Sequence, residues 1–266
     1  RRLPHRGWTM RLGRYPEAVH TRLGRQQAIW VHAVSVGEVI AVHPLIRRLT
    51  AEYPTVPLVL STVTPSGFAV ASKLLGDHGV TIYAPLDFRL AVQRALQTIQ
   101  PRLLVLAESE LWPNVIRLMK QRNAPVVVVN GRVSERAYRR YLVVRPWLNN
   151  LLADVNLFLM QSDMDAMRII RLGAPPSRVK VLGSLKWDAS LFARPSSTEL
   201  EELATRLGLG AEAAVIVAGS THRGEEQALL ETFRTIRPQF TDVRLVIAPR
   251  HLERVREIEK LAQQQG

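Results

Sequence analysis

The feature that most constrains this chain is a repeated alternation of short apolar runs with longer stretches of helical periodicity. From residue 29 onward the apolar runs are near-continuous, which is typical of strands buried on both faces of a parallel sheet. The stretches between them are long enough for helices that cross from one strand to the next. The alternation therefore predicts a doubly wound α/β fold. The predicted strands span residues 29–34, 58–63, 80–84, 103–107, 126–130 and 155–160, with a seventh at 179–182.

The predicted crossover helices follow the strands in order. They span residues 38–53, 66–75, 88–99, 113–122, 134–152 and 163–172. Pro44 is expected to kink the first helix or to start it afresh. The helix over residues 134–152 carries one basic face, formed by Arg132, Arg136, Arg139 and Arg140. Such a face is usually solvated, and the aromatic residues near it are an alternative sign of contact with a membrane or with phosphate groups.

A second α/β run begins after a turn around Pro195. It comprises a strand at 214–218, a helix at 225–234, a strand at 243–248 and a helix at 252–262. Two β-α units cannot cover both faces of a sheet, so we expect the sequence to stop inside its second domain and to leave one apolar face open. The predicted divisions are a basic segment (1–28), a Rossmann-like domain (29–183), a linker (184–198) and the first part of a second Rossmann-like domain (199–266).

Composition narrows the classes of function. The chain has 266 residues with 36 Lys and Arg against 23 Asp and Glu, a net charge of +13. Cysteine is absent, which excludes disulfides, thiolate metal sites and a cysteine nucleophile. The histidines lack metal-ligand spacing, so no metal is expected. The basic excess indicates an anionic partner, such as nucleic acid, a phospholipid surface or a phosphorylated ligand.

The first residues are strongly basic. Residues 1–25 hold seven arginines and one acid, Glu17, and no apolar run in the chain approaches the roughly 18 residues that cross a bilayer. We interpret this start as the flank of a segment outside the sequence, with a membrane anchor as one possibility.

Carboxylates follow two strands that the predicted topology brings together. If the strand order is 3-2-1-4-5, ligands bind where the order reverses, between the first and fourth strands. Glu38 follows the first strand, and Glu108 and Glu110 follow the fourth. A carboxylate there can act as a general base toward a hydroxyl group. The alternative is structural, because Ser35 and Glu38 also have capping-box spacing and acids are common at helix N-termini.

The second run and the inter-domain connection carry further polar candidates. Ser220 and Thr221 lie in a Gly/Ser/Thr turn that offers backbone N–H groups and hydroxyls to a phosphate, although it matches neither a P-loop nor a dinucleotide motif. Arg250 and His251 follow the next strand, where arginine can pair with phosphate. Lys186 lies at the connection. The alternative for all of these residues is that they have no functional role and simply lie in solvated turns or on the exposed surface.

Six short segments together resemble one known family, the 3-deoxy-D-manno-octulosonic acid (Kdo) transferases, which are glycosyltransferases of the GT-B fold. The segments occur in the family's order: HAVSVGE at 32–38, TVTPSG at 62–67, ESELWPN at 108–114, GSLKWD at 183–188, STHRGEE at 220–226 and PRH at 249–251. The resemblance runs from about Trp30 to the end of the chain. The family's later nucleotide-binding motifs and its N-terminal anchor are missing from the sequence.

The resemblance implies roles for individual residues. Glu38 would be the base that deprotonates the acceptor hydroxyl in an inverting transfer, with Ser35 and Gly37 beside it as substrate-binding residues. Glu108 and Lys186 would stabilise the transition state. Ser220, Thr221, Arg250 and His251 would bind the CMP-Kdo donor.

The resemblance also implies partners and a location. The acceptor would be a lipid A precursor, no cofactor or metal would be needed, and the enzyme would work at the cytoplasmic face of the bacterial inner membrane. We expect the 266 residues alone to be inactive, because half of the donor-binding domain is missing.

Three alternatives remain, one of which is a membrane-associated scaffold without transferase activity. Another GT-B sugar-nucleotide enzyme would have the same layout and a different donor. A nucleic-acid-binding module is suggested only by the charge, because no helix-turn-helix, RNP-type or zinc pattern is present.

Overall fold

The computed structural model describes residues 7–24, 26–192, 196–210, 213–240 and 242–265. The chain divides into two compact units, Arg1–Ala193 and Arg194–Gly266, and each unit is described by itself. Residues 1–6 and 25 of the predicted basic segment, and residues 193–195 of the predicted linker, lie outside the described residues.

The first unit is built on a seven-stranded parallel sheet. Its strands are β1 Ala28–His32, β2 Leu58–Thr62, β3 Val80–Tyr83, β4 Pro101–Ala107, β5 Val126–Gly131, β6 Leu157–Met160 and β7 Val179–Val181. The order is β3-β2-β1-β4-β5-β6-β7, so the predicted order is confirmed. Val31 of β1 pairs with Leu60 of β2 on one side and with Val105 of β4 on the other.

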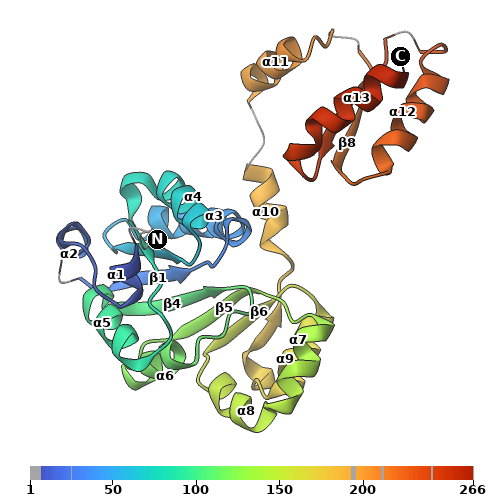
Figure 1. Ribbon diagram of the computed structural model, residues 1–266. Coiled ribbons are helices and arrows are strands. Elements are labelled where there is room, and N and C mark those ends of the chain that lie inside the picture. The colour runs from blue at the N-terminus through green and yellow to red at the C-terminus, as the bar shows by residue number, and fades with distance from the viewer. Residues whose placement is uncertain (1–6, 25, 193–195, 211–212, 241, 266) are drawn as a thin grey trace, which may run out of the picture. The chain divides into compact units, whose positions relative to one another are not determined.

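Helices cover both faces of this sheet. They are α1 Trp8–Arg11, α2 Glu17–Leu23, α3 Val36–Glu52, α4 Pro65–Leu75, α5 Arg89–Ile99, α6 Pro113–Gln121, α7 Glu135–Val143, α8 Arg145–Ala153, α9 Asp163–Leu172 and α10 Leu185–Phe192, with 3-10 turns η1 Gly76–His78 and η2 Pro176–Arg178. α3 and α4 lie on one side of the sheet, and α5, α6 and α8 lie on the other (Figure 1). Pro44 lies inside α3, which continues on both sides of it.

The two faces are distinct because side chains alternate along each strand. Trp30 and Leu104 are buried in the core under α5 and α6, whereas Val31 and Val105 are buried in the core under α3 and α4. This two-sided burial explains why the strands are near-continuous apolar runs. Within the described residues, no helix is both long and apolar enough to span a membrane.

Part of the basic N-terminal segment packs on the first unit. Tyr15, Val19 and Leu23 are buried in the core that also contains Trp30. The backbone N–H of Leu86 donates to the carbonyl of Arg11 at 2.7 Å. The apolar residues of this segment are spaced widely among arginines. For this reason the predicted first domain begins only at residue 29, whereas in the structure residues before it pack on the same core.

The single helix predicted over residues 134–152 is wrong. The structure has two helices, α7 and α8, which meet at Val144, and Pro146 lies in the first turn of α8. Proline lacks an N–H and disfavours a helical residue before it, so the break is expected at that position. Arg132 precedes α7, and the predicted basic face therefore does not run along one helix.

The second unit contains the two expected β-α pairs. Its elements are α11 Ser197–Arg206, β8 Val215–Thr221, α12 Glu225–Ile236, β9 Arg244–Pro249, η3 Leu252–Arg254 and α13 Val255–Gln265, with β8 and β9 parallel. Val217 of β8 is 69% exposed. An apolar groove of about 880 Å³ is lined by Phe233, Leu245 and Ile258, among others. These features agree with the expected open apolar face, while the low stability of residues 196–266 in isolation stays a prediction.

The central strand of the first unit allows a direct test of the buried core. Leu104 of β4 is fully buried, so Leu104→Ala is expected to lower the free energy of unfolding by about 2–5 kcal/mol, because it removes apolar contacts and leaves a cavity. Urea unfolding followed by circular dichroism measures the change. Leu90→Ala is the control, because Leu90 on α5 is 61% exposed and its truncation should change little. Equal effects would contradict the assigned core.

Candidate active site

The carboxyl edge of the sheet where β1 adjoins β4 is the position at which this type of fold can hold a ligand. β1 and β4 are neighbours, and the helices that follow them, α3 and α6, pack on opposite faces of the sheet. The carboxyl ends of the two strands therefore open between diverging helices, which is the usual ligand position in open α/β sheets. The residues found there are the Ser35–Glu38 turn and the Glu108–Glu110 turn.

Glu38 is held firmly at the start of α3. Its carboxylate accepts hydrogen bonds from the backbone N–H of Val34 and from the hydroxyl of Ser35, both at 2.9 Å. Ser35 in turn caps the helix by accepting from the backbone N–H of Glu38 at 3.5 Å. The capping role of Ser35 is confirmed, but the carboxylate of Glu38 bonds to Val34 rather than to the backbone of the cap residue. Gly37 lies in open space, since an added Cβ would meet only Ser35 Oγ at 4.0 Å.

Glu108 and Lys186 meet at the same edge of the sheet. Glu108 has a φ of 56°, a left-handed conformation that is costly for a residue other than glycine, and its backbone N–H donates to the carbonyl of Val129 at 2.9 Å. Its Oε1 lies 3.8 Å from Nζ of Lys186, which comes from the first turn of α10. The Lys186 side chain remains 58% exposed.

The carboxylates at this edge influence one another. Burial raises the pKa of Glu38 above its ordinary value, and the charges of Glu108 and Glu110 raise it further. Burial and the charge of Glu108 also raise the pKa of Glu110. The expected convergence of the three carboxylates is therefore present. A carboxylate with a raised pKa is a stronger base near neutral pH, and such groups concentrate at functional sites.

His32 supports this edge from inside the sheet, a role that its sequence motif did not reveal. Ser61 Oγ lies 2.8 Å from Nδ1 of His32 and accepts from the indole N–H of Trp30 at 2.7 Å. The His32 ring packs edge-on against Trp112, with centroids 4.9 Å apart. Burial lowers the pKa of His32 to about 4, so it is neutral at physiological pH. His32 therefore acts as a packing and hydrogen-bonding residue rather than a charged one.

The other candidate residues lie in the second unit, on two adjoining turns. The backbone N–H of Arg250 donates to the carbonyl of Thr221 at 3.0 Å, which joins the turn after β8 to the turn after β9. Ser220 has a φ of 61°, again left-handed. The rings of His222 and His251 lie 6.4 Å apart. Basic side chains and backbone amides of both turns are thus gathered at one end of the β8–β9 pair.

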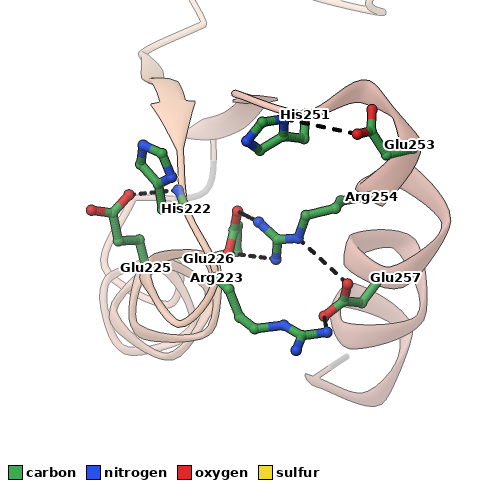
Figure 2. A network of polar contacts seen from close by, with 8 residues as sticks. All are labelled: His222, Arg223, Glu225, Glu226, His251, Glu253, Arg254 and Glu257. Atoms are coloured by element: carbon green, nitrogen blue, oxygen red, sulfur yellow. Dashed lines mark hydrogen bonds and ion pairs between the residues drawn. The ribbon is translucent and has the colours of Figure 1, made fainter.

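A buried ion pair ties these two turns together (Figure 2). Glu226 is fully buried at the start of α12, and both of its oxygens accept from the guanidinium of Arg254, at 2.8 and 3.2 Å. Arg254 also contacts Glu257 at 3.4 Å, and Glu257 contacts Arg223 at 3.2 Å. The hydrogen bond from Arg254 holds the pKa of Glu226 below its usual range. The pairing of Glu226 with Arg254 had no sequence signal, because the two residues are 28 positions apart.

The structure therefore gathers the predicted residues into two groups. Ser35, Gly37, Glu38, Glu108 and Lys186 belong to the first unit, and Ser220, Thr221, Arg250 and His251 belong to the second. In the described part of the chain, no three His, Asp or Glu side chains are arranged to hold a metal ion.

Comparison with known proteins identifies a family. Residues 6–189 match the family model described as 3-deoxy-D-manno-octulosonic-acid transferase (kdotransferase). The 3-deoxy-D-manno-octulosonic acid transferase of Haemophilus influenzae is 33% identical over 229 residues, which cover 86% of this chain and 53% of that protein. A bifunctional glycosyltransferase/methyltransferase of Fusobacterium nucleatum is 36% identical over 89% of this chain and 36% of its own length. The transferase of Chlamydophila psittaci is 28% identical over 94% of this chain and 58% of its own length. The chain thus spans about half the length, or less, of these relatives.

Solved structures share the fold at low sequence identity. The UDP-GlcNAc 2-epimerase of Neisseria meningitidis, bound to UDP-GlcNAc, has a TM-score of 0.64 and 14% identity over 90% of this chain and 69% of that one. A glycosyltransferase of Rickettsia africae has a TM-score of 0.59 and 9% identity over 91% of this chain and 66% of that one. These likenesses confirm the predicted α/β fold of the GT-B type.

The interaction among the carboxylates gives a titration prediction. Replacing Glu108 with Gln is expected to lower the pKa of Glu38, because it removes a negative charge that raises this pKa. Carboxyl ¹³C chemical shifts of labelled glutamates, followed against pH, measure the change, with Glu38→Gln used to assign the resonance. Glu52→Gln, at the far end of α3, is the control and should leave the pKa of Glu38 unchanged. An unaltered titration of Glu38 in Glu108→Gln would refute the proximity of the two groups.

Proposed function

The chain belongs to the family of Kdo transferases, which are glycosyltransferases, and from this premise we propose that it forms part of an enzyme that transfers Kdo from CMP-Kdo to a hydroxyl group of a lipid A precursor. The observation that carries the proposal is the position of Glu38, a buried carboxylate of raised pKa beside the Glu108–Lys186 pair. The chain spans about half the length of the relatives, so the activity of the whole enzyme is inferred rather than read from these residues alone.

In the proposed reaction, Glu38 takes the proton of the acceptor hydroxyl. The hydroxyl oxygen then forms a bond to the anomeric carbon of Kdo while the bond from that carbon to the phosphate of CMP breaks, and the electron pair leaves with CMP. Attack from the face opposite the leaving group inverts the configuration. The hydrogen bonds from Val34 and Ser35 fix the orientation of the carboxylate, which a general base requires.

Glu108 and Lys186 would stabilise the charges that develop during transfer. A sugar leaving its nucleotide passes through an oxocarbenium-like state, and a carboxylate such as Glu108 stabilises that positive charge. Lys186 cannot do so, and we assign it to a negative charge on the departing phosphate or on a phosphate of the acceptor. Its 58% exposure supports this role, since the ammonium group is open to a ligand.

The turns of the second unit would bind the donor. Ser220 offers a hydroxyl donor, whereas Thr221 is only 5% exposed and its buried hydroxyl would support the turn from inside. Arg250 with His251 would contact the CMP portion. The net charge of +13 favours encounters with substrates that carry phosphate and carboxylate groups. We expect these 266 residues alone to be inactive, because the described part of the second unit contributes only two strands to a donor domain that needs about five or six.

An exposed apolar and basic surface at the junction of α7 and α8 supports a membrane partner. We call it the α7–α8 elbow, and its exposed residues are Arg139, Arg140, Leu142, Val143, Val144, Arg145 and Trp147. Arginines that flank exposed apolar side chains suit the interface of an anionic bilayer. We therefore propose that the elbow contacts the cytoplasmic face of the bacterial inner membrane, where a lipid acceptor would lie.

The catalytic proposal is tested by Glu38→Gln in the product of the complete reading frame that contains this sequence. The rate of Kdo transfer from CMP-Kdo is expected to fall by about 10²–10⁴-fold, which is the usual contribution of a general base to the rate, because glutamine cannot take the proton. Affinity for CMP, measured by calorimetry, should not change. Glu52→Gln should retain full activity, since it lies at the other end of α3. Normal turnover in Glu38→Gln would leave Glu38 only a structural role.

The membrane proposal is tested by Val143→Asp. Val143 is 83% exposed at the centre of the elbow, and a carboxylate there would oppose insertion and repel anionic lipid. Flotation with vesicles of phosphatidylcholine and phosphatidylglycerol is expected to show binding that is several-fold weaker than for the wild-type protein. Leu90→Asp is the matched control, because Leu90 is also exposed but lies on α5. Equal binding by Val143→Asp and the wild-type protein would place the membrane contact elsewhere.

A further inference from the structure

Asn130 occupies an unusual position at the end of β5. It is buried, with 3% of its surface exposed, and its φ of 55° is left-handed. The register between β5 and β6 shifts between Val128 and Gly131, so Asn130 lies within the irregularity. Such irregularities at strand ends redirect side chains, and they are common next to functional sites. No sequence motif described above points to a role for Asn130.

The side chain of Asn130 bonds to α10 rather than to its own turn. Its Oδ1 accepts from the backbone N–H of Leu185, the first residue of α10, at 3.0 Å. The first N–H groups of a helix have no partner within the helix, so this bond caps α10 from a strand that lies 55 residues earlier in the chain. Only the oxygen of the amide can accept from an N–H, which fixes the orientation of the side chain.

The backbone alone does not account for asparagine at this position. Glycine would adopt the same left-handed conformation at lower cost. Asparagine also buries its Nδ2, which has no hydrogen-bond partner among the described residues. A buried amide donor without an acceptor lowers stability. The contribution that offsets this cost in the structure is the hydrogen bond from Oδ1 to Leu185.

The residue after Leu185 is Lys186, whose Nζ lies 3.8 Å from Oε1 of Glu108. The turn after β5 also contacts the turn that carries Glu108, because the backbone N–H of Arg132 donates to Ser109 Oγ at 2.9 Å. The β5 turn is therefore hydrogen-bonded to both segments that supply the ion pair.

We propose that Asn130 is a positioning residue of the transfer site: its side-chain oxygen holds the first turn of α10, and so keeps Lys186 beside Glu108. This inference rests on the proposed function for the role of Lys186, and on the hydrogen-bond geometry alone for the attachment of α10. Asn130 does not contact the reacting atoms. It acts through the backbone of the adjacent residue.

The test compares two asparagines in the same backbone conformation. Asn130→Gly keeps the left-handed turn and removes the bond to Leu185. Asn123→Gly is the matched control, because Asn123 has a φ of 54° and lies exposed between α6 and β5, at the opposite end of β5 from Asn130. Asn130→Asp is the rescue variant, since it retains an acceptor oxygen at the start of α10.

The first measurement is hydrogen exchange of the α10 first turn (residues 184–188) in the product of the complete reading frame. Exchange of the Leu185 amide is expected to be at least about tenfold faster in Asn130→Gly, unchanged in Asn123→Gly and largely restored in Asn130→Asp. Unchanged exchange in Asn130→Gly would overturn the proposal. This measurement does not depend on activity, so it decides the attachment of α10 even if no transfer of Kdo is detected and the proposed function fails.

The second measurement is the kinetics of Kdo transfer. Asn130→Gly is expected to lower kcat by about tenfold or more with little change in KM for the donor, because a small displacement of a reacting-site group is costly. In a Lys186→Ala background the same substitution should cause little further loss, since both act on one interaction. Losses that multiply in the double variant would show that Asn130 does not act through Lys186, and would overturn the proposal.

Discussion

The adjacency of β1 and β4 is the constraint on which the rest of the site depends. Because the strand order reverses there, the helices that follow the two strands leave toward opposite faces of the sheet, which makes its carboxyl edge the usual ligand position of such folds. Glu38 on one side and Glu108 on the other then face the same space, and their mutual repulsion adds to burial in raising the pKa of Glu38. Burial is the largest cause of the raised pKa of Glu38, and the topology of the sheet adds the smaller effect of the neighbouring charges.

Backbone conformation at the strand ends refines this arrangement. Glu108, Asn130 and Ser220 each follow or end a parallel strand, and each has a left-handed φ although none is glycine. Strained residues of this kind persist where the surroundings hold them, and they cluster at functional sites. Glu108 is held by Val129, and Asn130 by Gln161 and Leu185. The left-handed conformation of these three residues thus sets the direction of their side chains at the carboxyl ends of the strands.

Much of the first unit could be predicted, because burial on both faces leaves continuous apolar runs in the sequence. The rule that ligands bind where the strand order reverses also predicted, from the sequence, that Glu38 and Glu108 lie at the same edge of the sheet. The break between α7 and α8 was missed although Pro146 marks it, since the arginine spacing suggested one continuous face. The bond from Asn130 to Leu185 was beyond prediction, because it depends on a register shift that no residue pattern encodes. The pairing of Glu226 with Arg254 likewise depends on how two turns pack.

Charge balance explains how a basic protein can use a site lined by carboxylates. At the carboxyl edge of the first unit three carboxylates influence one another, and Lys186 pairs with one of them, Glu108. The excess of negative charge there disfavours phosphate. The phosphate-binding candidates, Arg250 and His251, lie in the second unit instead. Under the proposed mechanism this separation is useful: the anionic nucleotide is held by cations, while the carboxylates face the hydroxyl and the carbon that becomes positive. Lys186 then matters because it lies next to Glu108. The bond from Asn130 to Leu185 holds the start of α10 together with the bond from the Lys186 N–H to Ser184 Oγ and the packing of Leu185 on the core under α3.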